Sequence, residues 1–300
     1  SGHPGGSMSG ADFVQVLYSE FLIHDPENPC WEARDRFFLD PGHMSPMLYA
    51  QLCMTGHFTM DELQQLRQWG SVTPGHPERN VERGIENTSG PLGQGHTFAV
   101  GAAIAAKWFN ARYGEIHNPT IYAFISDGGI QEEISQGAGR MAGHLKLDNL
   151  IMYYDSNKIQ LSTLCDEVSS ENVAMKYEAW GWYVQDIDGH DPSAIRQAIL
   201  NAQAEKNRPS LIIGHTSMGK GCVTAKGDSW EGKTSTHGQP LSKSGASFEA
   251  TVKNLGGDPE NPFQIFPDVQ ALYDKRAEEL REITNQRYAA YHEWATANPL

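Results

Sequence analysis

Two polar side chains follow two successive apolar segments of the sequence. Asp127 comes directly after the run Thr120–Ser126, and Asn157 comes shortly after the run Leu150–Asp155. A carboxylate, an amide oxygen and a main-chain carbonyl suit a hard cation such as Mg²⁺ or Ca²⁺, but they are too few to enclose it. Water and the phosphates of a ligand would supply the other oxygens. The pattern predicts a metal-bridged diphosphate; the alternative is that Asp127 and Asn157 only form a turn and a cap.

Glycines accompany these groups. Gly128 and Gly129 let the backbone approach an oxyanion, and a helix predicted to begin near Glu132 would add partial positive charge at its N-terminus. A second glycine-rich segment, residues 89–95, leads into an alanine-rich helix and could line a pocket for a flat heterocycle. A tight turn with close helix packing explains the same glycines equally well, so this segment leaves both interpretations open.

Four of the twelve histidines lie in segments rich in glycine and proline, which we expect to be loops: His3, His43, His76 and His237. Imidazole can donate or accept a proton near pH 7, and glycine beside it lets the backbone come close to a ligand. An exposed loop histidine is the simpler explanation for any one of them. Four in the same setting favour phosphate binding or proton transfer.

The composition excludes several classes of protein. The 300 residues are 39% hydrophobic and 20% charged, which is typical of a folded globular chain. A formal charge of −14 argues against a nucleic-acid binder, whose footprint would be basic. No run of residues predicts a membrane span or a secretion signal.

The cysteines and the first residues bear on context. Four cysteines stand far apart without a CxxC pair, so they indicate neither a zinc site nor a disulfide framework, and a reducing compartment, the cytoplasm, is expected. The sequence begins at Ser1 without methionine, in a string rich in glycine, histidine and proline. We therefore expect a piece of a longer protein, trimmed at both ends, or a natural split subunit.

Helices and short strands alternate along the chain. Apolar residues spaced by three and four predict helices over Ala11–Ile23, Ser45–Thr55, Met60–Trp69, Thr97–Tyr113, Glu132–His144, Glu171–Gly181, Ser193–Glu205 and about Asp268–Ala295. Strands are predicted over Arg36–Leu39, Thr120–Ser126, Leu150–Asp155, Tyr183–Ile187 and Ser210–His215. Strands that are apolar on both faces indicate a doubly wound, mostly parallel sheet with helices on both faces, in the α/β class. One domain over residues 1–300 is the simplest organisation, with an irregular region at about 216–267.

This architecture decides whether Asp127 and Asn157 can meet. In an open parallel sheet the ligand crevice lies beyond the carboxyl ends of the strands. A right-handed crossover places the ends of two consecutive parallel strands on the same edge of the sheet. We therefore expect the two side chains to converge although a whole helix separates them in the sequence.

Eight motifs, in order, resemble the N-terminal, diphosphate-binding domain of the transketolase family, which uses thiamine diphosphate. They are SGHPG at residues 1–5, GH at 42–43, TPGHPE at 73–78, TSGPLGQG at 88–95, SDGGIQEE at 126–133, AGHLKLDNLI at 142–151, YDSNKI at 154–159 and THGQPL at 236–241. The resemblance covers nearly the whole chain. It implies the thiamine-diphosphate-binding fold.

The resemblance also implies roles for individual residues. Mg²⁺, with Ca²⁺ or Mn²⁺ as substitutes, would be held by Asp127, Asn157 and the Ile159 carbonyl, and would grip the cofactor diphosphate. His43 and His237 would contact the diphosphate, and Gly128 would stand beside it. Gly90 and Leu92 would touch the aminopyrimidine. His3, His76 and His237 would meet the sugar and move protons, and Glu132 would join a carboxylate network near a subunit interface. Two departures stand out: Ser126 replaces the usual glycine, and Gly137 replaces a second glutamate.

The reaction implied is the transfer of a two-carbon ketol unit from a ketose phosphate to an aldose phosphate, as in the pentose phosphate pathway. The glutamate that activates the cofactor and the arginines that grip the sugar phosphate belong, in the family, to a following pyrimidine-binding domain, which we do not find here. The chain would then be the cofactor-binding half of a homodimer or a heterotetramer, with neither nucleic acid nor membrane as a partner. The alternatives are half of another thiamine-diphosphate enzyme, similar to deoxyxylulose-phosphate synthase, or a non-catalytic cofactor-binding module.

Overall fold

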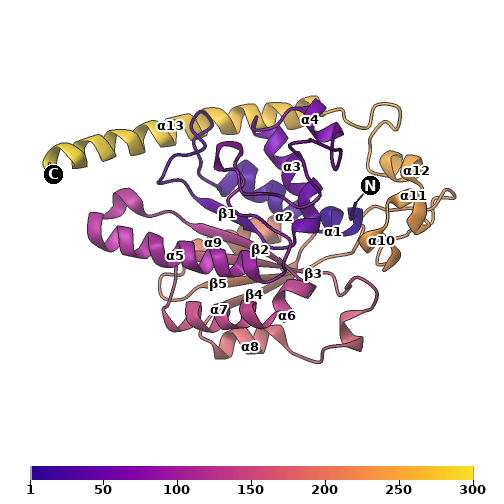
Figure 1. The fold of residues 1–300 in the computed structure, drawn as a ribbon, viewed down its shortest axis with the longest axis horizontal. Helices are drawn as coiled ribbons and strands as arrows, with labels where there is room; N and C mark the ends of the chain where they lie inside the picture. The colour runs from indigo at the N-terminus through magenta and orange to yellow at the C-terminus, as the bar shows by residue number, and fades with distance from the viewer. Residues whose placement is uncertain (1, 300) are drawn as a thin grey trace.

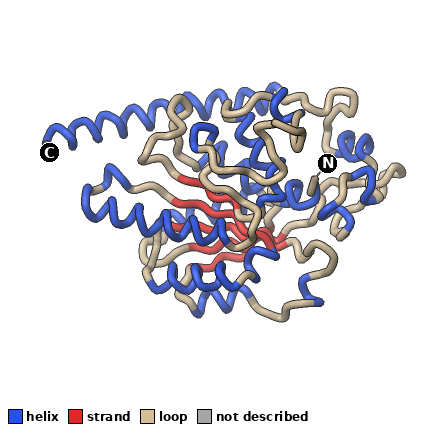
Figure 2. Tube along the Cα trace, viewed as in Figure 1, coloured by secondary structure: helices blue, strands red, loops and turns tan. Residues whose placement is uncertain are grey.

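The computed structural model describes residues 2–299, so Ser1, the first residue of the motif at positions 1–5, lies outside it, as does Leu300. Within these residues the strands form one five-stranded sheet in the order β1-β2-β3-β5-β4, with every neighbouring pair parallel. The strands, red in Figure 2, are β1 (Arg36–Leu39), β2 (Ile121–Ser126), β3 (Leu150–Ser156), β4 (Tyr183–Asp188) and β5 (Ser210–His215). The predicted α/β class with a parallel sheet is confirmed.

Helices cover both faces of this sheet (Figure 1). The α-helices are α1 (Pro4–Ser9), α2 (Ala11–Val16), α3 (Ser45–Met54), α4 (Met60–Gln64), α5 (Gln94–Tyr113), α6 (Asp127–Gln131), α7 (Glu133–His144), α8 (Val173–Ala179), α9 (Pro192–Ala204), α10 (Ser235–Gly238), α11 (Leu241–Ser244), α12 (Phe248–Asn254) and α13 (Pro267–Ala297). Several begin where the sequence supplies an N-cap: Asn172 accepts a hydrogen bond from the Met175 N–H, and Asp191 accepts one from the Ser193 N–H.

Alternate side chains of each central strand enter two separate cores. Tyr122 and Phe124 of β2 pack with α2, α3, α9 and α13, while Ala123 and Ile125 pack with α5, α7 and α8. Because side chains alternate between the faces of a strand, a strand covered on both faces must be apolar at every position. All six residues of β2 and all seven of β3 are buried, as the sequence predicts.

The connections between the strands determine where a ligand can bind on this sheet. The chain passes from β1 to β2, β3 and β4 through α5, α7 and α8 on one face, and returns from β4 to β5 through α9 on the other face. A return in the opposite direction must use the opposite face if every crossover is right-handed. The chain therefore reverses its direction at the edge strand β4 and places β5 beside β3. Ligands of such sheets bind beyond the carboxyl ends of the strands.

Some predicted boundaries are wrong. The helix expected over Ala11–Ile23 is α2 followed by a π-helical turn, Leu17–Phe21. The helix expected over Met60–Trp69 ends at Gln64, because Arg67 takes a left-handed φ of 63° and its N–H bonds to the Thr73 carbonyl. A residue in that conformation cannot continue a right-handed helix.

Two broader expectations also need correction. Strand β4 is an edge strand: α8 and α9 contact it from opposite faces, but its side chains are only half-buried or exposed, so it is not buried along its length like the central strands. The region at 216–267 is not simply irregular, because it contains the three short helices α10, α11 and α12. Within residues 2–299 the four cysteines are unpaired, as expected, and no helix combines the length and the apolar character needed to cross a membrane.

Candidate functional site

Asp127 is the first residue of α6, not a loop residue before a later helix. Ser126, the last residue of β2, caps this short helix by accepting a hydrogen bond from the Gly129 N–H (3.4 Å). The Asp127 carboxylate is buried; it accepts hydrogen bonds from the Tyr154 hydroxyl (2.5 Å) and from the N–H groups of Asn157 (3.1 Å) and Lys158 (2.9 Å). The ends of β2 and β3 therefore meet at one edge, as the crossover argument predicts.

The Asn157 carboxamide is held at both of its ends. Its Nδ2 group donates to Asp155 Oδ2 (2.9 Å), and its Oδ1 accepts from the Ile159 N–H (3.1 Å). Asp155 also accepts hydrogen bonds from the hydroxyls of Ser9 (2.7 Å) and Thr216. Burial raises the pKa of Asp155 to about 6, against the hydrogen bonds that favour its charged form.

The oxygen set suits a shared cation and not a closed protein cage. No group of three or more His, Cys, Asp and Glu side chains between residues 2 and 299 is placed to hold a metal ion. A cation at this edge would depend on one carboxylate, one amide oxygen and main-chain oxygens, with the rest supplied by its ligand. Burial raises the pKa of Asp127, and the hydrogen bonds from Tyr154 and Lys158 oppose that rise. A cation beside this carboxylate would favour its ionised form.

The structure brings three of the predicted histidines into direct neighbourhood. The ring centroids of His43 and His237 lie 5.2 Å apart, and His3 lies 5.1 Å from His43 and 5.8 Å from His237. His3 and His76 lie outside helices and strands, as expected, whereas His43 and His237 lie in short helical turns. His3 precedes α1 as its N-cap residue, His43 lies in a 3₁₀ turn that follows β1, and His237 lies in the single turn of α10.

Their surroundings favour the neutral form of all four histidines. Burial lowers the pKa of His43 to about 3 and that of His237 to about 4, with the neighbouring histidines contributing. Burial also lowers the pKa of His3 and His76, and the Arg67 cation adds to both effects. Nδ1 of His237 is buried and has no hydrogen-bond partner, which is costly for a polar atom. The cluster therefore offers neutral N–H donors and ring nitrogens to a ligand.

The loop at 88–93, which could line a pocket for a flat heterocycle, packs closely on two glycines, Gly42 and Gly128. A Cβ atom on Gly42 would lie 2.8 Å from the Ser89 Cβ and 2.9 Å from Cδ2 of His76, so a side chain there would displace both. A Cβ atom on Gly128 would lie 2.9 Å from Leu92 Cδ1. The loop at 88–93 therefore packs directly on the start of α6 and on the His43 turn.

Glu132 and Asp40 form a second acidic neighbourhood. Glu132 is the N-cap residue of α7, and a Cβ atom on Gly93 would lie 2.8 Å from its Cβ. Asp40, which follows β1, accepts from the Gly95 N–H (2.9 Å), and its other oxygen is buried without a partner. Burial raises the pKa of Asp40 to about 6, and the charge of Glu132 acts in the same direction.

Arg67 is a site residue that the sequence does not reveal. Its guanidinium lies 3.4 Å from Nδ1 of His3 and beside Gly75, next to His76. The periodicity places it inside a helix, and its left-handed backbone conformation has no signature in the sequence. Ser9, Asp155 and Thr216 are missed as well; for Asp155 the signal is its place in the YDSNKI motif.

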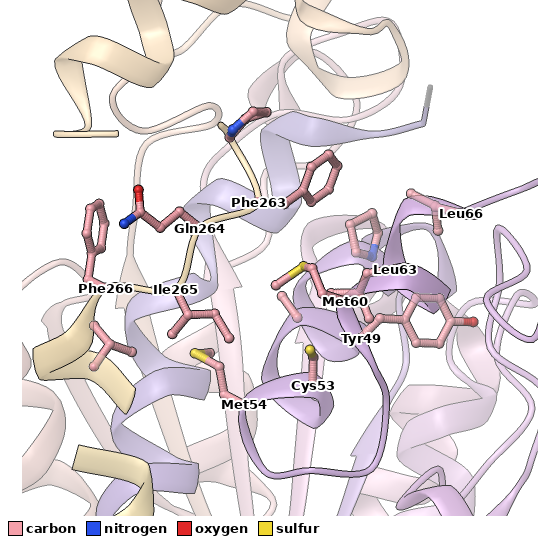
Figure 3. Close-up of a pocket in the computed structure, with 14 residues that line it drawn as sticks. Tyr49, Cys53, Met54, Met60, Leu63, Leu66, Phe263, Gln264, Ile265 and Phe266 are labelled. Carbon is pink, nitrogen blue, oxygen red and sulfur yellow. The ribbon is translucent and has the colours of Figure 1, made fainter. Parts of the chain in front are cut away.

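Two cavities of similar size differ in chemistry. One, of about 360 Å³, lies between α3, α4 and residues 262–266; Figure 3 shows Met60, Leu63 and Tyr49 on one side and Phe263 and Ile265 on the other. Its lining is almost wholly apolar. The other, of about 380 Å³, adjoins Asp127 and is lined by polar groups that include Tyr154, Ser156, Lys158 and Asp186. The second cavity is the one that suits a charged ligand.

The fold and the site together define a class: a parallel α/β domain whose buried carboxylates and histidines gather at the carboxyl edge of its sheet. The chain belongs to the family described as the transketolase, thiamine diphosphate binding domain, whose model matches residues 1–300. It is 41% identical to transketolase 1 of Escherichia coli over 299 residues, and 39% identical to the transketolase of Geobacillus stearothermophilus over 301. These alignments cover 97% and 98% of this chain and 44% of each relative.

Solved structures agree with the sequence comparisons. Transketolase from Leishmania mexicana superposes with a TM-score of 0.93 at 33% identity, covering 100% of this chain and 44% of that one. Transketolase from Campylobacter jejuni gives a TM-score of 0.89 at 35% identity, covering 100% and 45%. The chain therefore spans less than half the length of the transketolases that it matches.

Proposed function

We propose that this chain binds thiamine diphosphate through Mg²⁺ and supplies the diphosphate half of a transketolase site. The observation that carries the proposal is that Asp127 and Asn157, from two crossover units, meet at the sheet edge that also holds the histidine cluster. Membership in a family named for thiamine diphosphate binding supports the identity of the ligand.

The residues present fit this ligand. Asp127, Asn157 and the Ile159 carbonyl would hold the cation, with Ca²⁺ or Mn²⁺ as substitutes, and the diphosphate would complete its oxygen shell. His43 and His237 would contact the diphosphate, and the partnerless Nδ1 of His237 is the buried polar atom that such a contact would satisfy.

The other predicted residues suit the rest of the cofactor and the substrate. Gly128 would stand beside the diphosphate, and Gly90 and Leu92, in the loop that packs on α6, would meet the aminopyrimidine. Glu132 would belong to a carboxylate network at a subunit interface.

His3 and His76 would face the sugar. When bound, the cofactor supplies the carbanion stabilisation that allows the bond beside a ketose carbonyl to break. The protein positions the sugar and moves protons. Because their pKa values are lowered, the neutral imidazoles of His3 and His76 can accept a proton from a substrate hydroxyl and return it. Arg67, next to His3, would favour return of that proton.

The remaining half of the site would come from a pyrimidine-binding domain or subunit. Since the chain spans 44% of its relatives, we infer that ketol transfer between sugar phosphates requires that second part, and that the working unit is a homodimer or a heterotetramer. Such an enzyme would act in the cytoplasm, in the pentose phosphate pathway.

Calorimetric titration with thiamine diphosphate, with and without Mg²⁺, tests the binding. We expect binding that depends on the cation, because the protein provides too few oxygens to hold the cation without the diphosphate, and the diphosphate would be gripped through that cation. Equal affinity in the presence of EDTA would contradict the cation bridge. No binding under either condition would contradict the whole proposal.

Complementation tests the reaction. Adding a separately expressed pyrimidine-binding domain, at saturating cofactor and Mg²⁺, should restore ketol transfer between sugar phosphates, and replacing His76 should lower the rate. Turnover with pyruvate that is indifferent to His76 would instead indicate a synthase of the deoxyxylulose-phosphate type. Cofactor binding without turnover with any partner would indicate a non-catalytic module.

A further inference from the structure

Asp155 collects side-chain donors from three separate parts of the chain. It is fully buried at the carboxyl end of β3. It accepts hydrogen bonds from Ser9 at the end of α1, from Thr216 just after β5, and from Asn157 on its own segment. All three donors are side-chain groups, so the backbone hydrogen bonds of helices and strands do not explain the arrangement.

The bond to Asn157 fixes which end of a carboxamide faces the cation site. The two ends of an amide have nearly the same shape, but only the oxygen can bind a hard cation. An ionised carboxylate accepts hydrogen bonds and cannot donate them. Asp155 Oδ2 therefore binds the Nδ2 end, 2.9 Å away, and Oδ1 is left on the side of Ile159.

The other two hydrogen bonds of Asp155, from Ser9 and Thr216, connect it to the segments that carry His3 and His237. Ser9 is the last residue of α1, and His3 is the N-cap of that helix. Thr216 begins the segment that leads to α10 and His237, and Gly219 of the same segment donates its N–H to the Gly5 carbonyl (3.0 Å). Asp155 is thus the point where β3, α1 and the segment after β5 are joined.

We propose that Asp155 is a positioning residue that holds the Asn157 oxygen toward the cation and ties the segments carrying His3 and His237 to that ligand. The proposal rests on the proposed function, because it concerns the same cation. It predicts that Asp155 acts on metal affinity through Asn157, whereas a buried carboxylate with a merely structural role would act through stability alone.

The test is a double-substitution cycle on the full 300-residue chain. Mn²⁺ affinity is measured by electron paramagnetic resonance in the presence of saturating inorganic pyrophosphate, for the wild type, Asp155→Asn, Asn157→Ala and the double variant. We expect Asp155→Asn to weaken Mn²⁺ binding by about 10- to 100-fold, the usual effect of losing a group that orients a metal ligand. In the Asn157→Ala background the same change should have less than about a twofold effect, because the amide on which it acts is gone.

Asp35→Asn is the matched control. Asp35 is also a buried aspartate, and burial raises its pKa to about 6 as well. It lies at the opposite edge of the sheet, where its hydrogen-bond donors among residues 2–299 are the main-chain N–H groups of Ile23 (3.0 Å) and Thr120 (2.8 Å). It should leave Mn²⁺ affinity unchanged. Equal losses from Asp155→Asn in both backgrounds, or no more loss than Asp35→Asn gives, would overturn the positioning role.

The design separates this inference from the proposed function. Suppose that the wild type binds Mn²⁺ and that Asp127→Ala loses this binding, while Asp155→Asn leaves the affinity unchanged. That result would support the cation site and reject only the role of Asp155. Absence of wild-type Mn²⁺ binding would reject both. If Asp155→Asn does not fold, Thr216→Val removes one donor and keeps the buried carboxylate; it should weaken Mn²⁺ binding by about two- to fivefold, within the effect of outer-shell changes, and no effect would count against the proposal.

Discussion

At the amino-terminal edge of the sheet, Asp35 accepts two main-chain N–H groups, from Ile23 and from Thr120, the residue before β2. At the carboxyl-terminal edge, Asp155 accepts three side-chain donors, and Asp127 accepts a tyrosine hydroxyl and two N–H groups from the segment after β3. All three carboxylates are buried. They differ in what they hold: Asp35 joins main-chain groups, Asp155 joins side chains from three parts of the chain, and Asp127 joins one side chain and two main-chain N–H groups.

This difference shows how to separate structural from functional buried charge in a parallel sheet. Burial is the main cause that raises the pKa of Asp35 and of Asp155, in both cases to about 6, so the pKa does not distinguish them. The partners do. A carboxylate that satisfies main-chain groups affects stability when it is lost, whereas one that orients side chains around a ligand affects binding.

Removing the carboxylate at the carboxyl edge should have the largest effect. We expect Asp127→Ala to abolish measurable Mg²⁺-dependent binding of thiamine diphosphate, because it deletes the only charged member of the proposed ligand set. The measurement is calorimetric titration, with circular dichroism to verify the fold. Retained binding of wild-type strength would show that the cation does not use this edge.

A smaller effect is expected from the histidine cluster. His237→Ala should weaken pyrophosphate binding in the presence of Mg²⁺ by about 10- to 100-fold, since a hydrogen bond to a charged group is worth roughly 1.5–3 kcal/mol. The matched control is His57→Ala, because His57 is half-buried and bonds to Thr55 (2.9 Å), outside the cluster. If both variants lose affinity equally, the cluster has no special part in binding.

A substitution of Asp35 at the amino-terminal edge of the sheet should lower the stability of the fold and leave cation binding unchanged. Asp35→Asn turns an amide N–H toward one of the two main-chain donors and leaves a buried group unsatisfied. The free energy of unfolding should fall by about 1–3 kcal/mol, with no change in Mn²⁺ affinity. Urea unfolding measures the first quantity and electron paramagnetic resonance the second. A change in Mn²⁺ affinity would erase the distinction between the two edges.

Much of the fold is predictable from sequence because its causes are local. Strand β2 is apolar at nearly every position, and only a sheet covered on both faces buries such a strand. The end of α4 is not predictable, because it depends on the left-handed conformation of Arg67, which tertiary contacts impose. The exposure of β4 depends on its place at the sheet edge, which the order of elements along the chain does not determine.

The candidate site divides in the same way. The meeting of Asp127 and Asn157 follows from the handedness of crossovers, and the sequence was sufficient to predict it. The contacts of Arg67 and the donors of Asp155 could not be predicted, because Ser9, Asp155 and Thr216 come together only when α1, β3 and β5 are packed. The predicted roles of the site residues in binding cofactor and metal stay predictions until ligand binding is measured.

The smallest expected effect concerns pH and separates buried histidines from those of the cluster. His96 is fully buried near the start of α5, its Nδ1 lies 2.7 Å from the Ser135 hydroxyl, and burial lowers its pKa to about 3. Because the unfolded chain binds a proton near pH 6.5 and the folded chain does not, His96 lowers stability as the pH falls through 6.5. Replacing it with Asn should therefore reduce the stability lost between pH 7 and pH 6 by about 0.7 kcal/mol. Urea unfolding at both pH values, without ligand and with Mg²⁺ and pyrophosphate, measures this. An unchanged pH dependence would mean that His96 is protonated in the folded chain, and a difference that appears only with ligand would place His96 among the ligand-facing histidines.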